Sequence, residues 1–203
     1  MNSRSLLVLL PLCLIGLLFG LKADASVTAA DPGQILRNAT DELLTVIYEK
    51  PADGRLLAER ARPVMEKYFD FGLLTRRAVG PGWRQLTPGQ QQRTTKLLTE
   101  LIVRNYCAHF DTSVRSLITY AAPLTLAAGR SELPTTIIYS GRNIAVSYRA
   151  EQLPEGWRFY DVIVEGVSLV ANYRAQFTPL FQQGGGDAII SALEKNLAEH
   201  PSA

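Results

Sequence analysis

The sequence predicts an α+β protein in which helices pack against a small, curved antiparallel sheet of about four strands. Two observations lead to this prediction. In the first half of the chain and near its end, apolar residues recur every three or four positions, which is the spacing of an amphipathic helix. From about residue 114 to residue 164, the apolar runs are short, rich in β-branched and aromatic residues, and separated by turn-forming residues.

The helices of the first half are predicted from their capping residues. Asp31, followed by a proline, begins the first helix. A second helix begins at Asp53 and meets Pro63, where a kink or a break is expected. The longest helix begins at Thr87-Pro88-Gly89-Gln90, which combines a capping threonine, a first-turn proline and a capping-box glutamine, and it extends to about Phe110.

Two further helices are predicted at the C-terminal end. Ser168 can cap the first of them, and Gly184-Gly185-Gly186 breaks it. Asp187 then caps the last helix.

The strands are predicted from short β-rich runs with turns between them, an arrangement typical of an antiparallel meander. The segment Leu117–Leu126 has the composition of an additional strand. Both faces of the last run are largely apolar, so we expect that strand to be covered on both sides. The three main runs are Ile137–Tyr139, Asn143–Arg149 and Trp157–Val164.

The first 25 residues are typical of a cleavable signal peptide. Arg4 supplies the positive charge, Leu6–Leu21 is an apolar run, and Ala23-Asp24-Ala25 offers the small residues that a signal peptidase accepts. A retained membrane anchor is the alternative, but Pro11 interrupts the run, which is shorter than the roughly 20 apolar residues of a bilayer span. We therefore expect cleavage near Ala25-Ser26, leaving residues 26–203 as a single exported domain.

The composition excludes several classes of function. A formal net charge of +2 gives no electrostatic signature of nucleic-acid binding. The two histidines, His109 and His200, lie far apart, and no CxxC or HExxH spacing occurs, so we expect no metal site. Cys107 is the one cysteine outside the signal peptide, and its apolar helical surroundings indicate a buried small hydrophobe.

Three carboxylates, Asp70, Asp161 and Glu165, could act as general acids or bases. A carboxylate inside an apolar element more often caps backbone N–H groups or pairs with an arginine, and we favour this structural interpretation for Asp70 and Asp161. We therefore expect no catalytic residue.

The positive signal is a surplus of apolar surface. Each long helix has a wide apolar stripe, and the sheet can bury both of its faces. One interpretation is a thick ordinary core. The other is a deep apolar pocket between the curved sheet and the helices.

Several segments resemble one known family. The run Trp157–Leu169, written W-x-x-Y-D-x-x-x-E-G-V-S-L, is followed by the segment Asn172–Phe177. Upstream, Phe69-Asp70-Phe71, Trp83 and Tyr106 occur in the same order as in that family. These segments are similar to the MlaC family, also called toluene-tolerance auxiliary proteins, and the resemblance covers about residues 31–198.

The resemblance implies a fold like that of nuclear transport factor two, with an apolar pocket that holds the acyl tails. It also implies a periplasmic phospholipid carrier that works between an outer-membrane lipoprotein complex and an inner-membrane ABC transporter with an MCE-domain protein, and so maintains outer-membrane lipid asymmetry. Phospholipid is then the cargo, and no cofactor is implied. The segment from Phe110 to Ile144 is short and alanine-rich and matches the family pattern poorly, which leaves the number of tails open and a hopanoid cargo as an alternative.

We expect ten apolar or aromatic residues on the predicted helices and strands to contact lipid, although several of them could instead fill the core. Arg174 is a candidate contact for a headgroup or a protein partner. The ten residues are Leu97, Leu101, Tyr106, Val146, Tyr148, Val162, Val164, Tyr173, Phe177 and Leu180.

Two other functions remain open at this stage. A cavity enzyme on the same fold would use Asp161 with Tyr160 or Tyr148. A lipid-free adaptor would bind membrane-complex partners and nothing else. For all three hypotheses a monomer is the default expectation.

Overall fold

The structure is a computed structural model that describes residues 31–49, 54–108 and 114–199. The predicted signal peptide, residues 1–25, lies outside these ranges, as do His109 and His200. Five α-helices and one 3-10 helix are described. They are α1 (Pro32–Glu49), α2 (Gly54–Tyr68), α3 (Phe71–Val79), η1 (Gly80–Gln85), α4 (Pro88–Ala108) and α5 (Leu169–Glu199).

The strands form one antiparallel sheet with the order β1-β3-β4-β5-β6, and β2 also pairs with β3. The α+β class with a curved antiparallel sheet is confirmed, but the described sheet has six strands rather than about four. The segment Leu117–Leu126 contributes two short strands because Pro123, which cannot donate a backbone hydrogen bond, lies between them. The strands are β1 (Leu117–Tyr120), β2 (Leu124–Ala127), β3 (Arg130–Tyr139), β4 (Arg142–Leu153), β5 (Gly156–Val164) and β6 (Val167–Ser168).

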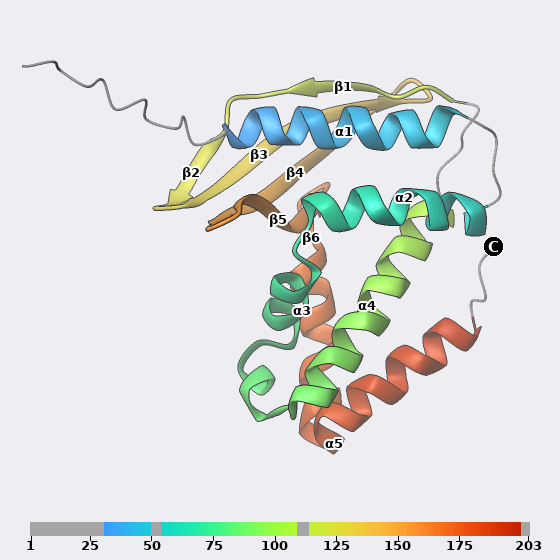
Figure 1. Ribbon diagram of the computed structural model, residues 1–203, viewed down its shortest axis with the longest axis vertical. Helices are drawn as coiled ribbons and strands as arrows, with labels where there is room; N and C mark the ends of the chain where they lie inside the picture. The colour runs from blue at the N-terminus through green and yellow to red at the C-terminus, as the bar shows by residue number, and fades with distance from the viewer. Residues whose placement is uncertain (1–30, 50–53, 109–113, 200–203) are drawn as a thin grey trace, which may run out of the picture.

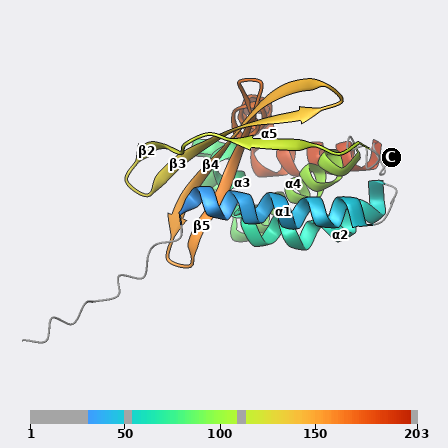
Figure 2. The same ribbon diagram turned by 90° about the horizontal axis from the view of Figure 1, so that it is seen from above.

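The helices are divided between the sheet and a separate bundle (Figures 1 and 2). Helix α1 lies along the sheet and packs on β3, and α2 packs on α1. Helices α3, α4 and α5 gather with α2 at the far end of β5 (Figure 1). Each part has its own buried apolar cluster, one within the helical bundle and one between α1, α2 and the sheet.

The two parts are joined where α2 ends. Phe69 forms a β-bridge with Phe159 of β5, and the amide of Asp70 donates a 2.9 Å hydrogen bond to the Phe159 carbonyl. The two phenylalanine rings lie 5.4 Å apart. Asp70 then caps α3, because its carboxylate accepts a 2.7 Å hydrogen bond from the amide of Leu73. The structural interpretation of Asp70 is therefore confirmed.

Other sequence signals for helix ends are also tested by the structure. Thr87 and Gln90 form a reciprocal capping box, with hydrogen bonds of 3.0 and 3.3 Å. Helix α5 is broken at Gly184 and Gly185, whose backbone angles are not helical. The sequence predicts a kink or a break at Pro63, but α2 is not broken there. Pro63 is exposed, as is Glu59 four residues before it, so water can satisfy the carbonyl that loses its partner.

Candidate functional site

The helix-facing side of the sheet brings four of the ten predicted residues together. Val146 pairs with Val164 and Tyr148 with Val162 across β4 and β5, so all four side chains lie on one face. Leu133 of β3 pairs with Tyr148 and belongs to the buried cluster beneath α1, which identifies this face as the inner one. Val146 is buried, whereas Val164 is 44% exposed at the end of β5. The inner face is therefore apolar but only partly covered.

A fifth predicted residue, Tyr106, lies near the C-terminal end of α4. Desolvation by the surrounding protein raises the pKa of its hydroxyl far above the usual value, and the neighbouring Tyr148, Cys107 and Tyr48 raise this pKa further. Yet 41% of the surface of Tyr106 is exposed. Tyr106 is thus partly packed by its neighbours and partly accessible.

Two tyrosines that sequence reasoning missed, Tyr48 and Tyr120, interact electrostatically with Tyr106 and Tyr148 respectively. Desolvation, together with a smaller contribution from Tyr120 on β1, raises the pKa of Tyr148 to about 12. Tyr48, at the end of α1, interacts in the same way with Tyr106. We refer to Tyr48, Tyr106, Tyr120 and Tyr148 as the tyrosine cluster. The sequence contains several tyrosines near the ends of predicted helices and strands. Their spacing along the chain does not show that they lie close together in the fold.

The hydroxyls of Tyr48 and Tyr120 fasten β1 and the segment before it to α1. Tyr48 donates a 3.0 Å hydrogen bond to the carbonyl of Val114 and accepts one of 2.8 Å from the amide of Ser116. The hydroxyl of Tyr120 shares a short hydrogen bond with that of Thr40 on α1. These hydrogen bonds therefore join α1 to the edge of the sheet along the length of the helix.

The other five predicted residues lie elsewhere. All of them belong to, or pack against, the buried cluster of the helical bundle. Their place in this cluster makes them part of the core, the alternative that the sequence left open. They are Leu97, Leu101, Tyr173, Phe177 and Leu180.

Asp161 is buried on the opposite, outer face of the sheet. Its carboxylate accepts hydrogen bonds from the Ser168 hydroxyl at 2.7 Å and from the Val170 amide at 3.0 Å. Arg149 lies 3.6 Å from the same carboxylate and also donates to Glu132 at 2.9 Å. The structural interpretation of Asp161 is confirmed, since it both caps a helix and pairs with an arginine.

This position bears on the enzyme hypothesis. Asp161 pairs with Arg149, whereas Tyr148 pairs with Val162, so Asp161 and Tyr148 lie on opposite faces of the sheet. Tyr160 is the extra residue of a β-bulge in β5, and its ring stacks against the guanidinium of Arg77 at 4.1 Å. The structure therefore does not bring Asp161 and Tyr148 together as a catalytic pair.

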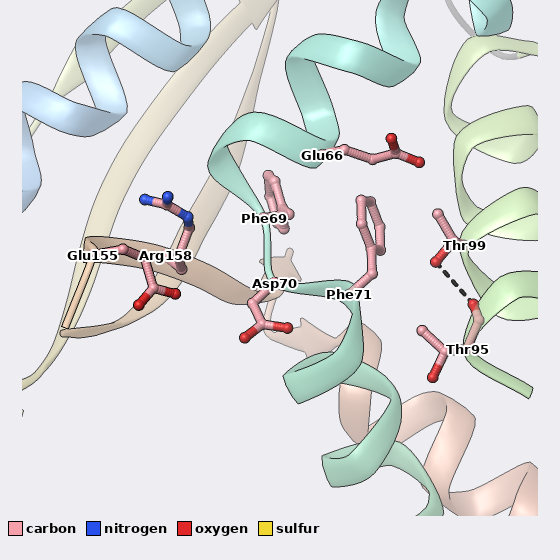
Figure 3. Close-up of a pocket in the computed structure, with 8 residues that line it drawn as sticks. All are labelled: Glu66, Phe69, Asp70, Phe71, Thr95, Thr99, Glu155 and Arg158. Atoms are coloured by element: carbon pink, nitrogen blue, oxygen red, sulfur yellow. Dashed lines mark hydrogen bonds between the residues drawn. The ribbon is translucent and has the colours of Figure 1, made fainter. Parts of the chain in front are cut away.

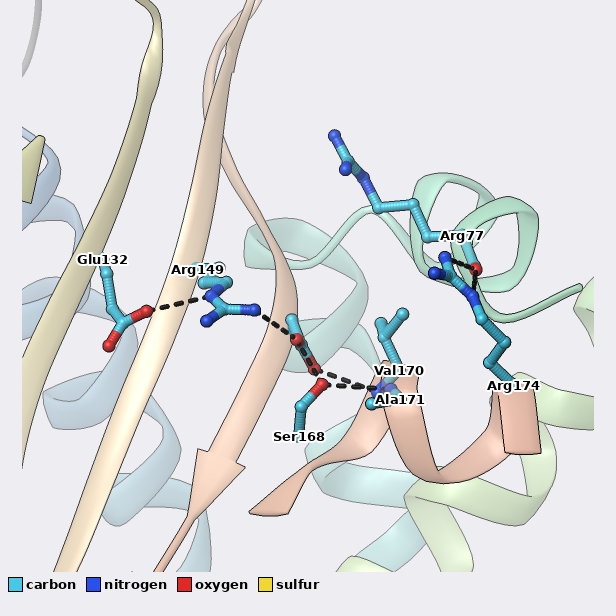
Figure 4. Close-up of polar contacts among 8 residues, drawn as sticks. Arg77, Glu132, Arg149, Ser168, Val170, Ala171 and Arg174 are labelled. Atoms are coloured by element: carbon cyan, nitrogen blue, oxygen red, sulfur yellow. Dashed lines mark hydrogen bonds and ion pairs between the residues drawn. The ribbon is translucent and has the colours of Figure 1, made fainter. Parts of the chain in front are cut away.

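Arg174, the candidate headgroup or partner contact, is exposed on α5 (Figure 4). Its guanidinium donates to the backbone carbonyl of Arg77, through Nε at 3.0 Å and through a second, shorter bond. This carbonyl belongs to the last turn of α3, where helical carbonyls lack partners within the helix. Arg174 thus joins α5 to the end of α3.

Two cavities at the surface of the described residues bear on where a ligand could lie. The larger, of about 350 Å³, lies between the α2–α3 junction, α4 and the β4–β5 turn (Figure 3). Phe69 and Phe71 line it, but so do the carboxylates of Glu66, Asp70 and Glu155, which an acyl chain would have to desolvate. The smaller, of about 180 Å³, lies beside Tyr120 at the N-terminal end of α1. Neither is lined by any of the ten predicted residues.

Comparison with protein families matches residues 37–195 to the family described as MlaC protein. This chain belongs to the MlaC family. The match spans most of the chain, including both faces of the sheet and the helical bundle, so the family resemblance drawn from the Trp157–Leu169 run is confirmed.

A solved structure shares the fold of this MlaC-family chain. It is the phospholipid-binding protein from Ralstonia solanacearum, determined in complex with a phospholipid. The two structures superpose with a TM-score of 0.78 at 25% sequence identity, over 84% of this chain and 98% of the other. No match is found among curated protein sequences.

Two further observations concern the described residues of this MlaC-family chain. None of its helices there has the length and apolar character needed to cross a bilayer. No group of three or more histidine, cysteine, aspartate or glutamate residues in that part of the chain could hold a metal ion.

Proposed function

We propose that this chain is a periplasmic phospholipid carrier. In this proposal residues 1–25 are a signal peptide, and residues 26–203 form a single domain that takes phospholipid between an outer-membrane lipoprotein complex and an inner-membrane ABC transporter with an MCE-domain protein. The observation that carries it is the shared fold with a protein solved in complex with a phospholipid, within the MlaC family. The partly covered inner face of the sheet supports it, because Val162 and Val164 offer apolar surface beside the tyrosine cluster.

The physical problem for such a carrier is the aqueous gap between two membranes. Each buried methylene contributes about 0.8 kcal/mol, so an acyl chain of about 15 methylenes is about 12 kcal/mol less stable in water than in an apolar phase. A protein interior replaces the bilayer as that phase, and the relevant difference is then between protein and bilayer. The free energy of an acyl chain is nearly the same in the protein and in the bilayer, so lipid can pass in either direction. The direction of transport comes from the partners.

The enzyme hypothesis is less well supported than the carrier. The MlaC family and the phospholipid-binding structural neighbour point to binding and transport. The carboxylate that an enzyme would use, Asp161, already accepts hydrogen bonds from Ser168 and Val170 and pairs with Arg149.

The test is native mass spectrometry of the purified protein, followed by extraction and identification of the lipid. We expect one co-purified phospholipid per chain, and transfer of labelled phospholipid from donor to acceptor vesicles. If the extracted lipid is a hopanoid, the carrier function is retained and the proposed cargo changes from phospholipid to hopanoid. A protein that is empty and takes no lipid from vesicles would leave the adaptor as the better hypothesis.

A further inference from the structure

Near each end of helix α1, an arginine side chain stacks on a tyrosine ring. The guanidinium carbon of Arg37 lies 4.3 Å from the centre of the Tyr120 ring, near the N-terminal end of the helix. The guanidinium carbon of Arg115 lies 4.9 Å from the centre of the Tyr48 ring, near the other end. The cavity of about 180 Å³ is at the first of these ends.

The inner wall of this cavity continues into the core beneath α1. Leu36 and Leu133 line it, and both are buried members of the cluster between α1, α2 and the sheet. Tyr120 lines it as well, and Tyr148 is the cross-strand neighbour of Leu133. The cavity therefore adjoins both the buried core beneath α1 and the tyrosine cluster.

The rim of the cavity carries two opposite charges. Asp31 and Arg37 both line it, and neither forms an ion pair with any residue that the structure describes. One carboxylate oxygen of Asp31 accepts a 3.2 Å hydrogen bond from the amide of Gly33, which leaves the other oxygen available. Asp31 and Arg37 are six positions apart in the sequence, which corresponds to about 9 Å along a helix.

The size of the cavity indicates what it can hold. Pockets that enclose a whole small-molecule ligand have volumes of roughly 300–1,000 Å³, so a cavity of about 180 Å³ fits only one part of a lipid. An apolar inner wall below a rim with one cation and one anion matches the junction between acyl chains and a zwitterionic headgroup. We propose that this cavity is the headgroup subsite, where Arg37 binds the phosphate and Asp31 the positively charged amine of a zwitterionic glycerophospholipid. This inference rests on the proposed carrier function.

The geometry favours Arg37 over the other candidate cations. Stacking on Tyr120 holds its guanidinium plane in place, and the N–H groups at the edge of that plane can still donate to phosphate oxygens. The nearby N-terminus of α1 adds a favourable field for an anion. Arg174, in contrast, already donates to the carbonyl of Arg77.

The length of α1 is compatible with this placement. Its 18 residues span about 27 Å. The apolar layer of one bilayer leaflet is about 15 Å thick. A headgroup at Arg37 therefore leaves enough length for acyl chains to reach Tyr48 and Tyr106 at the other end.

The experiment offers the lipid-free protein vesicles that contain equal amounts of dioleoyl phosphatidylethanolamine, dioleoyl phosphatidylglycerol and dioleoylglycerol. Native mass spectrometry then counts each bound lipid. The three lipids share their acyl chains, so differences in uptake report the headgroup alone. We expect the natural protein to prefer both phospholipids to dioleoylglycerol, and phosphatidylethanolamine to phosphatidylglycerol.

Four variants locate the subsite. Arg37→Gln should lower the preference for phospholipid over dioleoylglycerol about tenfold, the usual effect of losing one charge-assisted hydrogen bond. Arg37→Lys should retain most of it, because the charge remains. Asp31→Asn keeps the helix cap and should lower the preference for the zwitterionic lipid about threefold. Arg115→Gln is the matched control and should change neither preference, with thermal unfolding checking that each variant is folded.

The outcomes separate the two proposals. Unchanged preferences in Arg37→Gln would overturn the headgroup subsite while leaving the carrier intact. A loss of preference in Arg115→Gln instead would place the headgroup at the opposite end of α1 and would also overturn it. If the natural protein takes up none of the three lipids, the carrier function itself fails, and the subsite fails with it.

Discussion

The hydroxyl of Ser168 donates a 2.7 Å hydrogen bond to Asp161, and this contact fixes the start of α5 on β5. The same hydroxyl accepts a 3.0 Å hydrogen bond from the amide of Ala171, so Ser168 is itself the cap of the helix. Asp161 adds a bond to the amide of Val170. One buried carboxylate thus connects the sheet to the helical bundle at a second place, in addition to the Phe69–Phe159 bridge.

We predict that Asp161 contributes to stability. Asp161→Ala should lower the free energy of unfolding by about 3 kcal/mol, because the Val170 amide and the Arg149 guanidinium lose a buried acceptor. Urea denaturation measures the difference. Asp41→Ala, at an exposed position of α1, is the control and should cost less than about 0.5 kcal/mol. Equal stability of both variants would contradict this role.

The inner face of the sheet should be sensitive to charge. Val162→Arg places a cation among apolar side chains beside Tyr148, so we expect reduced lipid occupancy or reduced stability. Ala145→Arg, on the outer face of β4, should leave both unchanged because the position is exposed. Lipid extraction and thermal unfolding of the two variants give the comparison. Unchanged occupancy and stability in Val162→Arg would remove Val162 from the binding surface.

Truncation should distinguish the core from the tyrosine cluster. Phe177 is 3% exposed within the helical bundle, and Phe177→Ala should lower the free energy of unfolding by about 3–5 kcal/mol. Tyr106→Ala should cost less stability because much of that side chain is already accessible, and should instead reduce lipid retention. Denaturation curves and lipid release rates for both variants test this division. It would be wrong if Phe177→Ala changed lipid retention and left stability intact.

The pKa of Tyr148 predicts a dependence of stability on alkaline pH. An exposed tyrosine loses its proton near pH 10, whereas desolvation raises the pKa of Tyr148 to about 12. Between these values the folded state keeps a proton that the unfolded state releases, so stability should fall as pH rises from about 10 to 12. Tyr148→Phe should make this decline less steep. Denaturation midpoints of the natural protein and of Tyr148→Phe are measured across that pH range. The two sets of midpoints would decline in parallel if Tyr148 made no contribution.

Local signals in the sequence predicted much of the fold. The capping box of Thr87 and Gln90 lies within four residues, and short-range hydrogen bonds of this kind need no knowledge of the tertiary structure. The alternation of β4 and β5 likewise placed Val146 with Tyr148, and Val162 with Val164. The structural role of Asp161 could be predicted from its chemistry, because a carboxylate among apolar residues needs hydrogen-bond donors or a cation.

The division of inward-facing residues between packed core and accessible surface could not be predicted in this way. Leu97 and Tyr106 are both apolar positions of α4, yet Leu97 is packed among other helices while Tyr106 remains accessible. Periodicity identifies the face that points inward, and the packing of other elements decides whether that face is filled. The cavity beside Arg37 escaped prediction for the same reason, since it joins residues of α1 to residues about 85–100 positions later.

The pairing of β1 and β2 with the same strand affects how the protein behaves at high concentration. Strand β3 is ten residues long, and an uncovered edge of that length would invite the strands of other molecules. Instead, the edge is occupied by two four-residue strands, which are interrupted by Pro123, and β2 contains a register shift. A continuous strand cannot add along such an outer edge. This edge of the sheet is thereby protected against edge-to-edge aggregation.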